Sequence, residues 1–289
     1  MKTFVSLCLL LSTSAFGAQV LKFSDLKKLS SATTAQFSFD EAINLSANFG
    51  TTQMDPDLKP YFGPTTGKSE LCVPTTLANY LIYQMAITQK LPISDKVPGV
   101  SKDLTTIDAN ALIIELSKKC KTNYDTGTNS DNLMVCIGDV FNEYFGKKVA
   151  IKRIVKADKV TNPDYVTWEN RQPDINDLRE AMKKGLPVLG SVNWNIIDPV
   201  TKKWKYTSGH VFGIFGYSWE KYFENNLLQL QIMDPAYVWT VSTQTSVYNN
   251  VTAIRRRDEV DSSIFIDGRG FNGQTSRGWL GAATIIDFE

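Results

Sequence analysis

The sequence predicts an α+β fold, in which an N-terminal helical part packs on a C-terminal antiparallel β-sheet. Up to Gly185, most of the structured segments carry apolar residues at the spacing of buried helices. After Gly185, the segments are short, apolar or alternating, and rich in Val, Ile, Phe, Trp and Tyr, as strands are. Helices followed by strands are the element order of an α+β protein. The 289 residues are 43% hydrophobic and 21% charged, which is enough apolar material for a full core.

The first residues have the three parts of a secretion signal. Lys2 supplies a positive charge, the apolar run Phe4–Leu11 follows, and Ala15-Phe16-Gly17 places small residues before a cut ahead of Ala18. The apolar run is too short to span a bilayer, which takes about 20 residues. We therefore expect a cleaved signal peptide over 1–17 and a secreted or periplasmic protein without a membrane span.

Beyond the signal peptide, we expect an N-terminal extension over 18–62 and one domain over 63–289. Early in this domain, apolar residues recur at four-residue spacing and predict a helix with a wide buried face. These residues are Leu77, Leu81 and Met85. Pro74 suits the first turn of this helix, where a missing N–H costs nothing. Cys72 therefore lies at or just before a helix N-terminus.

Three further helices and seven strands follow from the same two periodicities. The helices are expected over Asn110–Lys119, over Leu133–Phe145, and from a cap at Asp174 or Asn176 to Gly185. The strands are expected over Val149–Val155, Pro187–Trp194, Val211–Tyr217, Leu227–Met233, Tyr237–Val241, Ser263–Ile266 and Ala283–Phe288. Turn residues separate most of the later strands, which favours antiparallel pairing.

The cysteines that remain after signal cleavage are expected to form one disulfide and to leave one free thiol. Cys8 lies in the apolar run of the signal and is expected to leave with it, which leaves Cys72, Cys120 and Cys136. A disulfide between Cys120 and Cys136 closes a polar loop of about 15 residues, which stabilises a protein by roughly 3 kcal/mol in the chain-entropy model. This pairing leaves Cys72 as a free thiol in an oxidising compartment, where an unpaired thiol invites a functional explanation.

His210 is the only histidine of the chain. Metal sites that need two histidines of one chain are thereby excluded, and we expect neither a metal nor a cofactor. The formal net charge of +1 gives no electrostatic reason for nucleic acid as a partner. The obvious partner of His210 is Cys72. Their separation, 210 − 72 = 138 residues, falls within the roughly 130–150 residues between the nucleophilic Cys and the base His of papain-like enzymes.

A Cys–His pair of this kind carries nucleophilic chemistry. The thiolate is the attacking form of cysteine, and both a helix N-terminus and an adjacent imidazolium favour it. With Cys72 as the nucleophile, His210 acts as base and acid and hands a proton to the leaving group. A third group orients the imidazole by accepting its other N–H. Asp234, at the end of the next predicted strand, is our candidate for this group, and Asn193 is the alternative.

Four blocks in order resemble the peptidase C39-like family, whose members have the papain-like fold. The cysteine block Cys72-Val73-Pro74-Thr75-Thr76-Leu77 is similar to the family's Cys-Gly-Pro-Thr/Ala-Ser/Thr-Leu. The other similar blocks are Lys121–Thr128, Asp177–Asn193, and Gly209–Tyr217 with the strand that ends at Asp234-Pro235. The likeness covers about Gly63 to Ala236. It implies a papain-like cysteine hydrolase, in particular a peptidase, that acts on peptide or protein substrates through a thioacyl intermediate with Cys72, His210 and Asp234.

Two positions depart from the family pattern. Val73 stands where the family has Gly, and its branched side chain is expected to narrow the cleft. Papain-like enzymes usually place a Gln about six residues before the Cys, but Thr66 stands there, and Gln53 is far upstream. We expect a backbone N–H and one hydroxyl to stabilise the oxyanion instead. These donors come from Cys72 and from Thr65, Thr66 or Ser69.

Two other functions stay open from the sequence. The first is a C39-like domain with impaired catalytic residues that acts as a binding module. The second is acyl transfer to an amine through the same thioacyl intermediate, because transglutaminase-like enzymes share a Cys-His-Asp set. The sequence identifies neither the substrate's side chains nor the oligomeric state.

Overall fold

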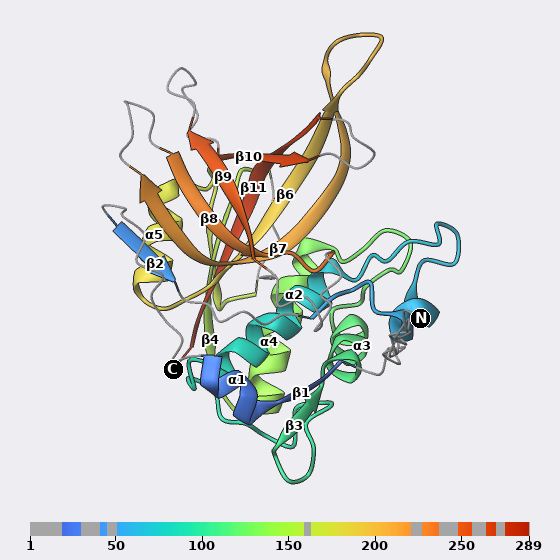
Figure 1. The fold of residues 1–289 in the computed structure, drawn as a ribbon, viewed down its shortest axis with the longest axis vertical. Helices are drawn as coiled ribbons and strands as arrows, with labels where there is room; N and C mark the ends of the chain where they lie inside the picture. Colours follow the sequence, from blue (N-terminus) through green and yellow to red (C-terminus); the bar gives the residue numbers. More distant parts are fainter. Residues whose placement is uncertain are drawn as a thin grey trace, which may run out of the picture.

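The computed structural model describes residues 19–29, 41–44, 51–158, 163–220, 227–236, 248–255, 264–269 and 275–288. The predicted signal peptide 1–17 and the predicted strand Tyr237–Val241 lie outside these described residues. Most helices come before most strands along the chain, so the predicted α+β class is confirmed. Figure 1 shows the helices α1 to α4 gathered on one side of a strongly curved sheet.

The helices are α1 (Phe23–Leu29), the 3-10 helix η1 (Pro56–Tyr61), α2 (Cys72–Ala86), α3 (Ala109–Lys119), α4 (Ser130–Phe145) and α5 (Ile175–Lys183). The four helices predicted from periodicity are confirmed as α2 to α5. Side chains of Asp108, Asn129 and Asp174 accept backbone N–H groups at the starts of α3, α4 and α5. Gly146 and Gly185 follow α4 and α5 with φ of 62° and 70°, a conformation that suits glycine and ends a helix.

The strands are β1 (Val20–Lys22), β2 (Glu41–Asn44), β3 (Thr106–Asp108), β4 (Val149–Val155), β5 (Val166–Glu169), β6 (Val188–Ile197), β7 (Trp204–Glu220), β8 (Leu227–Met233), β9 (Tyr248–Arg255), β10 (Ile264–Arg269) and β11 (Thr275–Phe288). β1 and β3 pair by themselves. The others form a nine-stranded sheet in the order β10-β9-β8-β7-β6-β11-β4-β5, with β2 paired to β7. Because β10 also pairs with β11, the strands β6 to β11 close into a ring.

The prediction of an antiparallel sheet is wrong for one pair. β4 and β5 run parallel, with Ile151 opposite Val166, whereas the other pairs are antiparallel, so the sheet is mixed. Neither β5 nor β9 was predicted, because β5 has only four residues and both strands carry Thr, Asn or Glu at strand positions. Strand formation by such residues depends on the neighbouring strand rather than on local preference.

Helix α2 forms the centre of the larger core. All of its residues from Val73 to Ala86 are buried, and α1, α3, α4 and sheet residues such as Leu189 and Phe215 surround it. A second core joins α5 to the sheet and includes Leu178 and Phe212. Each fully buried aliphatic or aromatic side chain contributes roughly 1.5–3 kcal/mol. Burial on all sides therefore fixes the axis of α2, and with it the position of its first residue.

The segment before residue 63 packs on the same core. Phe23 and Leu26 of α1 are buried there, β1 pairs with β3, and β2 pairs with β7. Gln19 donates through Nε2 to the Oδ1 of Asn110 (2.7 Å) and to the carbonyl of Thr52 (3.0 Å). Within the residues that the structure describes, no helix combines the length and the apolar character needed to cross a bilayer.

The predicted disulfide between Cys120 and Cys136 is confirmed. It joins the C-terminal end of α3 to α4, and both cysteines are buried. In the loop that it closes, Oδ1 of Asp125 accepts the backbone N–H groups of Thr65 (2.9 Å) and Thr66 (3.1 Å). The loop that leads into α2 is therefore attached to the disulfide-closed loop.

Candidate active site

Cys72 is the first residue of α2, as expected from the sequence, and its thiol is free and half-buried. The residue before it, Leu71, is the N-cap and makes no side-chain capping bond. Pro74 in the first turn has no N–H to satisfy. The helix N-terminus is therefore left for a ligand or a developing anion, and its dipole favours negative charge at Cys72.

His210 lies on β7 and pairs with Val192 of β6. Asp234 comes directly after β8, which pairs with β7 through Gly213 and Met233. The antiparallel return thus brings Asp234 back beside His210, where its Oδ1 accepts the Nε2–H of the ring at 2.6 Å. The same oxygen accepts the backbone N–H of Ala236 at 2.8 Å, which holds the carboxylate in place.

The electrostatics of this pair favour a charged imidazole. Burial alone lowers the pKa of His210, but hydrogen bonds to Asp234 and Cys72 and the charges of both groups outweigh it and raise the pKa to about 10. Because Nε2 faces Asp234, Nδ1 is the ring nitrogen that remains for Cys72. The three side chains that the sequence singled out are thus brought together, with His210 between an acid and a thiol.

One hydrogen bond ties the cysteine helix to the histidine strand. Thr76, one turn after Cys72, donates its hydroxyl to the carbonyl of Val211, one residue after His210, at 3.0 Å. Thr76 is buried, so water does not compete for this bond. The bond restricts sliding of α2 along β7 and so maintains the spacing of the thiol and the imidazole.

A second connection, which sequence reasoning missed, comes from residues 51–53, here called the 51–53 strap. Thr52 Oγ1 and the backbone N–H of Gln53 both donate to the carbonyl of Pro235, at 3.0 and 2.9 Å. At the other side, Ser69 Oγ donates to the carbonyl of Gln53 (3.0 Å), and Gln53 Nε2 donates to the carbonyl of Ser69 (3.2 Å). The strap therefore links the turn after Asp234 to the segment before Cys72.

The strap is anchored on α2 by one buried amide. Asn79 Oδ1 accepts both the backbone N–H and the hydroxyl of Thr51 at 2.8 Å, and its Nδ2 donates to the Thr51 carbonyl at 3.2 Å. Both residues are buried. No local sequence pattern predicts this pairing, since an Asn inside an apolar helix is ambiguous until its distant partner is known.

The oxyanion candidates have other hydrogen bonds. The hydroxyl proton of Ser69 is donated to Gln53, and Thr66 is exposed, with its Oγ1 accepting the N–H of Lys68 at 3.3 Å. Thr65 is also exposed. The backbone N–H groups at the start of α2 are therefore the better donors. Gln53, although far upstream in sequence, does reach the segment before the thiol by way of the strap.

Two further expectations are corrected by the side-chain positions. Val73 is 3% exposed and packs in the larger core, so it does not narrow the cleft as expected. Asn193 is exposed on β6, and its amide nitrogen lies against Gly281, 2.7 Å from where a Cβ would stand there. Asp234, and not Asn193, is the hydrogen-bonding partner of His210.

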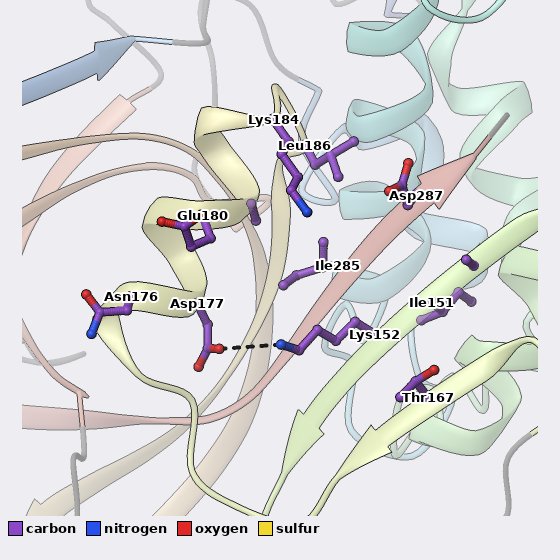
Figure 2. A pocket seen from close by; sticks show the side chains of 12 residues that line it. Ile151, Lys152, Thr167, Asn176, Asp177, Glu180, Lys184, Leu186, Ile285 and Asp287 are labelled. Atoms are coloured by element: carbon purple, nitrogen blue, oxygen red, sulfur yellow. Dashed lines mark ion pairs between the residues drawn. The ribbon is translucent and has the colours of Figure 1, made fainter.

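A separate hollow lies between α5 and the strands β4, β5 and β11 (Figure 2). Lys152 points into it and pairs with Glu169 (2.8 Å) and Asp177 (3.7 Å). Asp177 and Glu169 also pair with Arg171. None of the three candidate catalytic residues lines this hollow, and Lys152 is already paired with neighbouring carboxylates.

Comparison with known proteins identifies no relative of this chain. No protein-family model matches the chain, and no curated protein matches it. The resemblance to the C39-like family therefore depends on the four residue blocks of the sequence alone, and membership in that family stays a prediction.

Proposed function

We propose that this protein is an exported papain-like cysteine hydrolase of the C39-like kind that cleaves peptide or protein substrates. The observation that carries the proposal is the ordered contact of Cys72, His210 and Asp234, with the 2.6 Å bond on Nε2 and the thiol on the other side of the ring. Nucleophile, base and orienting group in mutual reach are what thiol-mediated acyl transfer needs. The buried disulfide agrees with an oxidising compartment.

The first half-reaction forms a thioester. The thiolate of Cys72 attacks the carbonyl carbon of the scissile bond, and the carbonyl electron pair moves to oxygen. When the tetrahedral intermediate collapses, the C–N bond breaks, and Nδ1 of His210 donates its proton to the leaving amine. Asp234 stabilises the ring in its charged form before this transfer and holds its orientation throughout.

The second half-reaction is hydrolysis of the thioester. Neutral Nδ1 of His210 takes a proton from water, the hydroxide adds to the carbonyl carbon, and the C–S bond breaks to release the acid and restore the thiolate. In both halves, the negative oxygen needs donors. The uncapped N-terminus of α2 supplies backbone N–H groups and a favourable dipole.

One observation favours a second candidate function, that of a binding module with impaired catalysis. The side chain of Gln53 donates to the backbone carbonyl of Ser69, and the side chain of Ser69 donates to the backbone carbonyl of Gln53. Neither side chain is therefore aligned as an oxyanion donor in this conformation. Loss of one such donor typically lowers the rate ~100- to 1000-fold. A site with only backbone donors would hold a thioacyl-forming ligand but turn it over slowly.

The experiment compares purified protein with its Cys72→Ala variant on a mixture of casein-derived peptides, with products identified by mass spectrometry. Asn193→Ala serves as a control, because its amide nitrogen lies against Gly281 of β11 and Asp234 is the hydrogen-bonding partner of His210. We expect cleavage by the natural protein and by Asn193→Ala, and none by Cys72→Ala. Cleavage that survives Cys72→Ala would refute the proposal.

Two other results would select an alternative. Peptide bound but not cleaved by the natural protein would favour the binding module. Product that carries an added primary amine, with a yield that rises with amine concentration, would favour acyl transfer, because an amine then replaces water in the second half-reaction.

A further inference from the structure

The acid of the candidate catalytic set lies beyond the regular pairing of its strand. β8 ends at Met233, which is paired with both β7 and β9, and Asp234 begins the turn that follows. Within this turn, the N–H of Ala236 orients the carboxylate, but this bond moves with the turn. Sheet pairing therefore fixes β8 without fixing the carboxylate that contacts His210.

The 51–53 strap holds this turn through one oxygen atom. The carbonyl of Pro235 accepts the hydroxyl of Thr52 at 3.0 Å and the N–H of Gln53 at 2.9 Å. The hydroxyl oxygen of Thr52 also accepts the N–H of Met54 at 3.0 Å, so its own proton is directed to Pro235. Thr52 is 4% exposed, so water does not compete for these bonds. Because Pro235 follows Asp234 directly and its ring fixes φ, the held carbonyl restricts where the carboxylate lies.

Thr52 is itself held on both sides. The side-chain amide of Gln19 pairs with both of its backbone groups, since Oε1 accepts the N–H at 2.9 Å and Nε2 donates to the carbonyl at 3.0 Å. On the other side, Thr51 is bound to Asn79 by three hydrogen bonds. Asn79 lies on α2 about two turns after Cys72. The helix with the thiol and the turn with the carboxylate are therefore joined through Thr52.

We infer that Thr52 is a positioning residue of the candidate site: its hydroxyl holds the turn with Asp234 at the spacing from α2 that His210 needs to contact both the acid and the thiol. The inference rests on the proposed function and deepens it, because it identifies what keeps acid, base and nucleophile in one arrangement. The bond from the ring to the carboxylate is 2.6 Å long, and hydrogen bonds weaken when the distance or the donor angle departs from the ideal. A shift of the turn therefore weakens the bond that keeps the ring charged.

The test compares two substitutions at Thr52. Thr52→Val keeps the branched shape of threonine and has no hydroxyl, whereas Thr52→Ser keeps the hydroxyl and loses a methyl group. The quantity measured is the pKa of the imidazole of His210, the only histidine, by NMR of tag-free protein, and it needs no turnover. The titratable groups that act on this ring are Asp234, Cys72 and, from the segment before α2, Glu70. None of them is altered by either substitution.

We expect Thr52→Val to lower the pKa of His210, which is about 10 in the natural protein, and Thr52→Ser to leave it unchanged. The expected fall is roughly one unit, a tenfold loss of proton affinity, because part of a charge-assisted hydrogen bond is lost. Tyr80→Phe is the matched control. Tyr80 follows Asn79 on α2, is fully buried, and donates its hydroxyl to the carbonyl of Ile286 at 3.2 Å. Its loss should lower the free energy of unfolding and leave the ring pKa unchanged.

A second variant, Gln19→Ala, acts on the same path without removing the hydroxyl. It deletes the amide that pairs with the backbone of Thr52, and Gln19 is only half-buried. We expect a smaller fall of the ring pKa in the same direction. An unchanged ring pKa in Thr52→Val, or an equal fall in Thr52→Ser or Tyr80→Phe, would overturn the proposal. Where Thr52→Val yields no folded protein, Gln19→Ala decides in its place, and an unchanged ring pKa there overturns the proposal.

Peptide cleavage separates this inference from the proposed function. We expect Thr52→Val to lower kcat on the casein-derived peptides by up to roughly 100-fold, the loss typical of a catalytic group displaced by about 1 Å. Thr52→Ser and Tyr80→Phe should keep the activity. Cleavage that depends on Cys72, with the same ring pKa in both Thr52 variants, overturns the positioning role and leaves the hydrolase intact. The expected pKa pattern without cleavage by the natural protein refutes the hydrolase and supports the positioning role.

Discussion

Replacing Asp234 by Asn is expected to remove most of the pH dependence of folding stability between pH 6.5 and 10. In the folded protein, the pKa of His210 is raised from 6.5 to about 10. A group with a raised folded-state pKa contributes its full stabilisation below pH 6.5 and loses it as the pH rises through 10. Because one pKa unit corresponds to 1.36 kcal/mol, the whole effect has an upper limit on the order of 5 kcal/mol.

Cys72 also raises this pKa, so the comparison is made in proteins that carry Cys72→Ala. The bond to Asp234 is the largest of the contributions that raise the pKa, and removal of one member of a buried charged pair typically costs 3–5 kcal/mol. At pH 6, we therefore expect Asp234→Asn to lower the free energy of unfolding by roughly 3 kcal/mol. Near pH 10, where the ring is mostly neutral in both proteins, the loss becomes much smaller.

The assay is urea unfolding followed by tryptophan fluorescence at one-unit steps from pH 6 to 10, with the disulfide intact. Because His210 is the only histidine, few other side chains titrate between pH 6.5 and 9. Asn193→Ala should keep the slope of the parent protein. An equal loss of stability in Asp234→Asn at pH 6 and pH 10 would refute the reasoning.

Three further predictions concern the surroundings of the site. Thr76→Val removes the donor to the carbonyl of Val211 and leaves that carbonyl unsatisfied. In urea unfolding, we expect the free energy of unfolding to fall by about 1–3 kcal/mol. No loss would show that the bond does not join α2 to β7. Replacing both Cys120 and Cys136 by Ser should cost roughly 3 kcal/mol by the same assay, and an unchanged midpoint would contradict the stabilising role of the disulfide. Ser69→Ala should lower kcat far less than the ~100-fold typical of a lost oxyanion donor, because the Ser69 hydroxyl already donates its proton to the carbonyl of Gln53. A loss of ~100-fold would restore Ser69 as an oxyanion residue.

The sequence alone was sufficient to predict the helices and strands whose signals lie in neighbouring residues. The apolar spacing and Pro74 predicted α2 with Cys72 at its start, and the alternation of β7 and β8 predicted the strands that bring Asp234 back toward His210. A hairpin return depends on two adjacent strands and the segment between them, so its geometry follows from short-range information. The disulfide could also be predicted from the sequence, because Cys120 and Cys136 lie close together along the chain and Cys72 lies far from both.

The rest of the site depends on contacts between segments far apart in the chain. Gln53 is far upstream of the nucleophile and was expected to reach it only by a long loop. The 51–53 strap brings it to Ser69 and to Pro235, which lies 183 residues beyond Thr52. Such contacts carry no periodicity and no spacing rule. The burial of the Val73 side chain could not be predicted from the sequence either, because packing of α2 against three other helices decides which of its faces turns to the core.

The most direct test of the central claim is an NMR titration of the imidazole of His210 in tag-free protein. Since the chain has one histidine, the ring signals need no assignment. We predict that the ring stays protonated on both nitrogens well above pH 6.5 and titrates near pH 10, and that Cys72→Ala and Asp234→Asn each lower its pKa. A ring that titrates near pH 6.5, with the same midpoint in both variants, would show that Cys72, His210 and Asp234 do not act on one another.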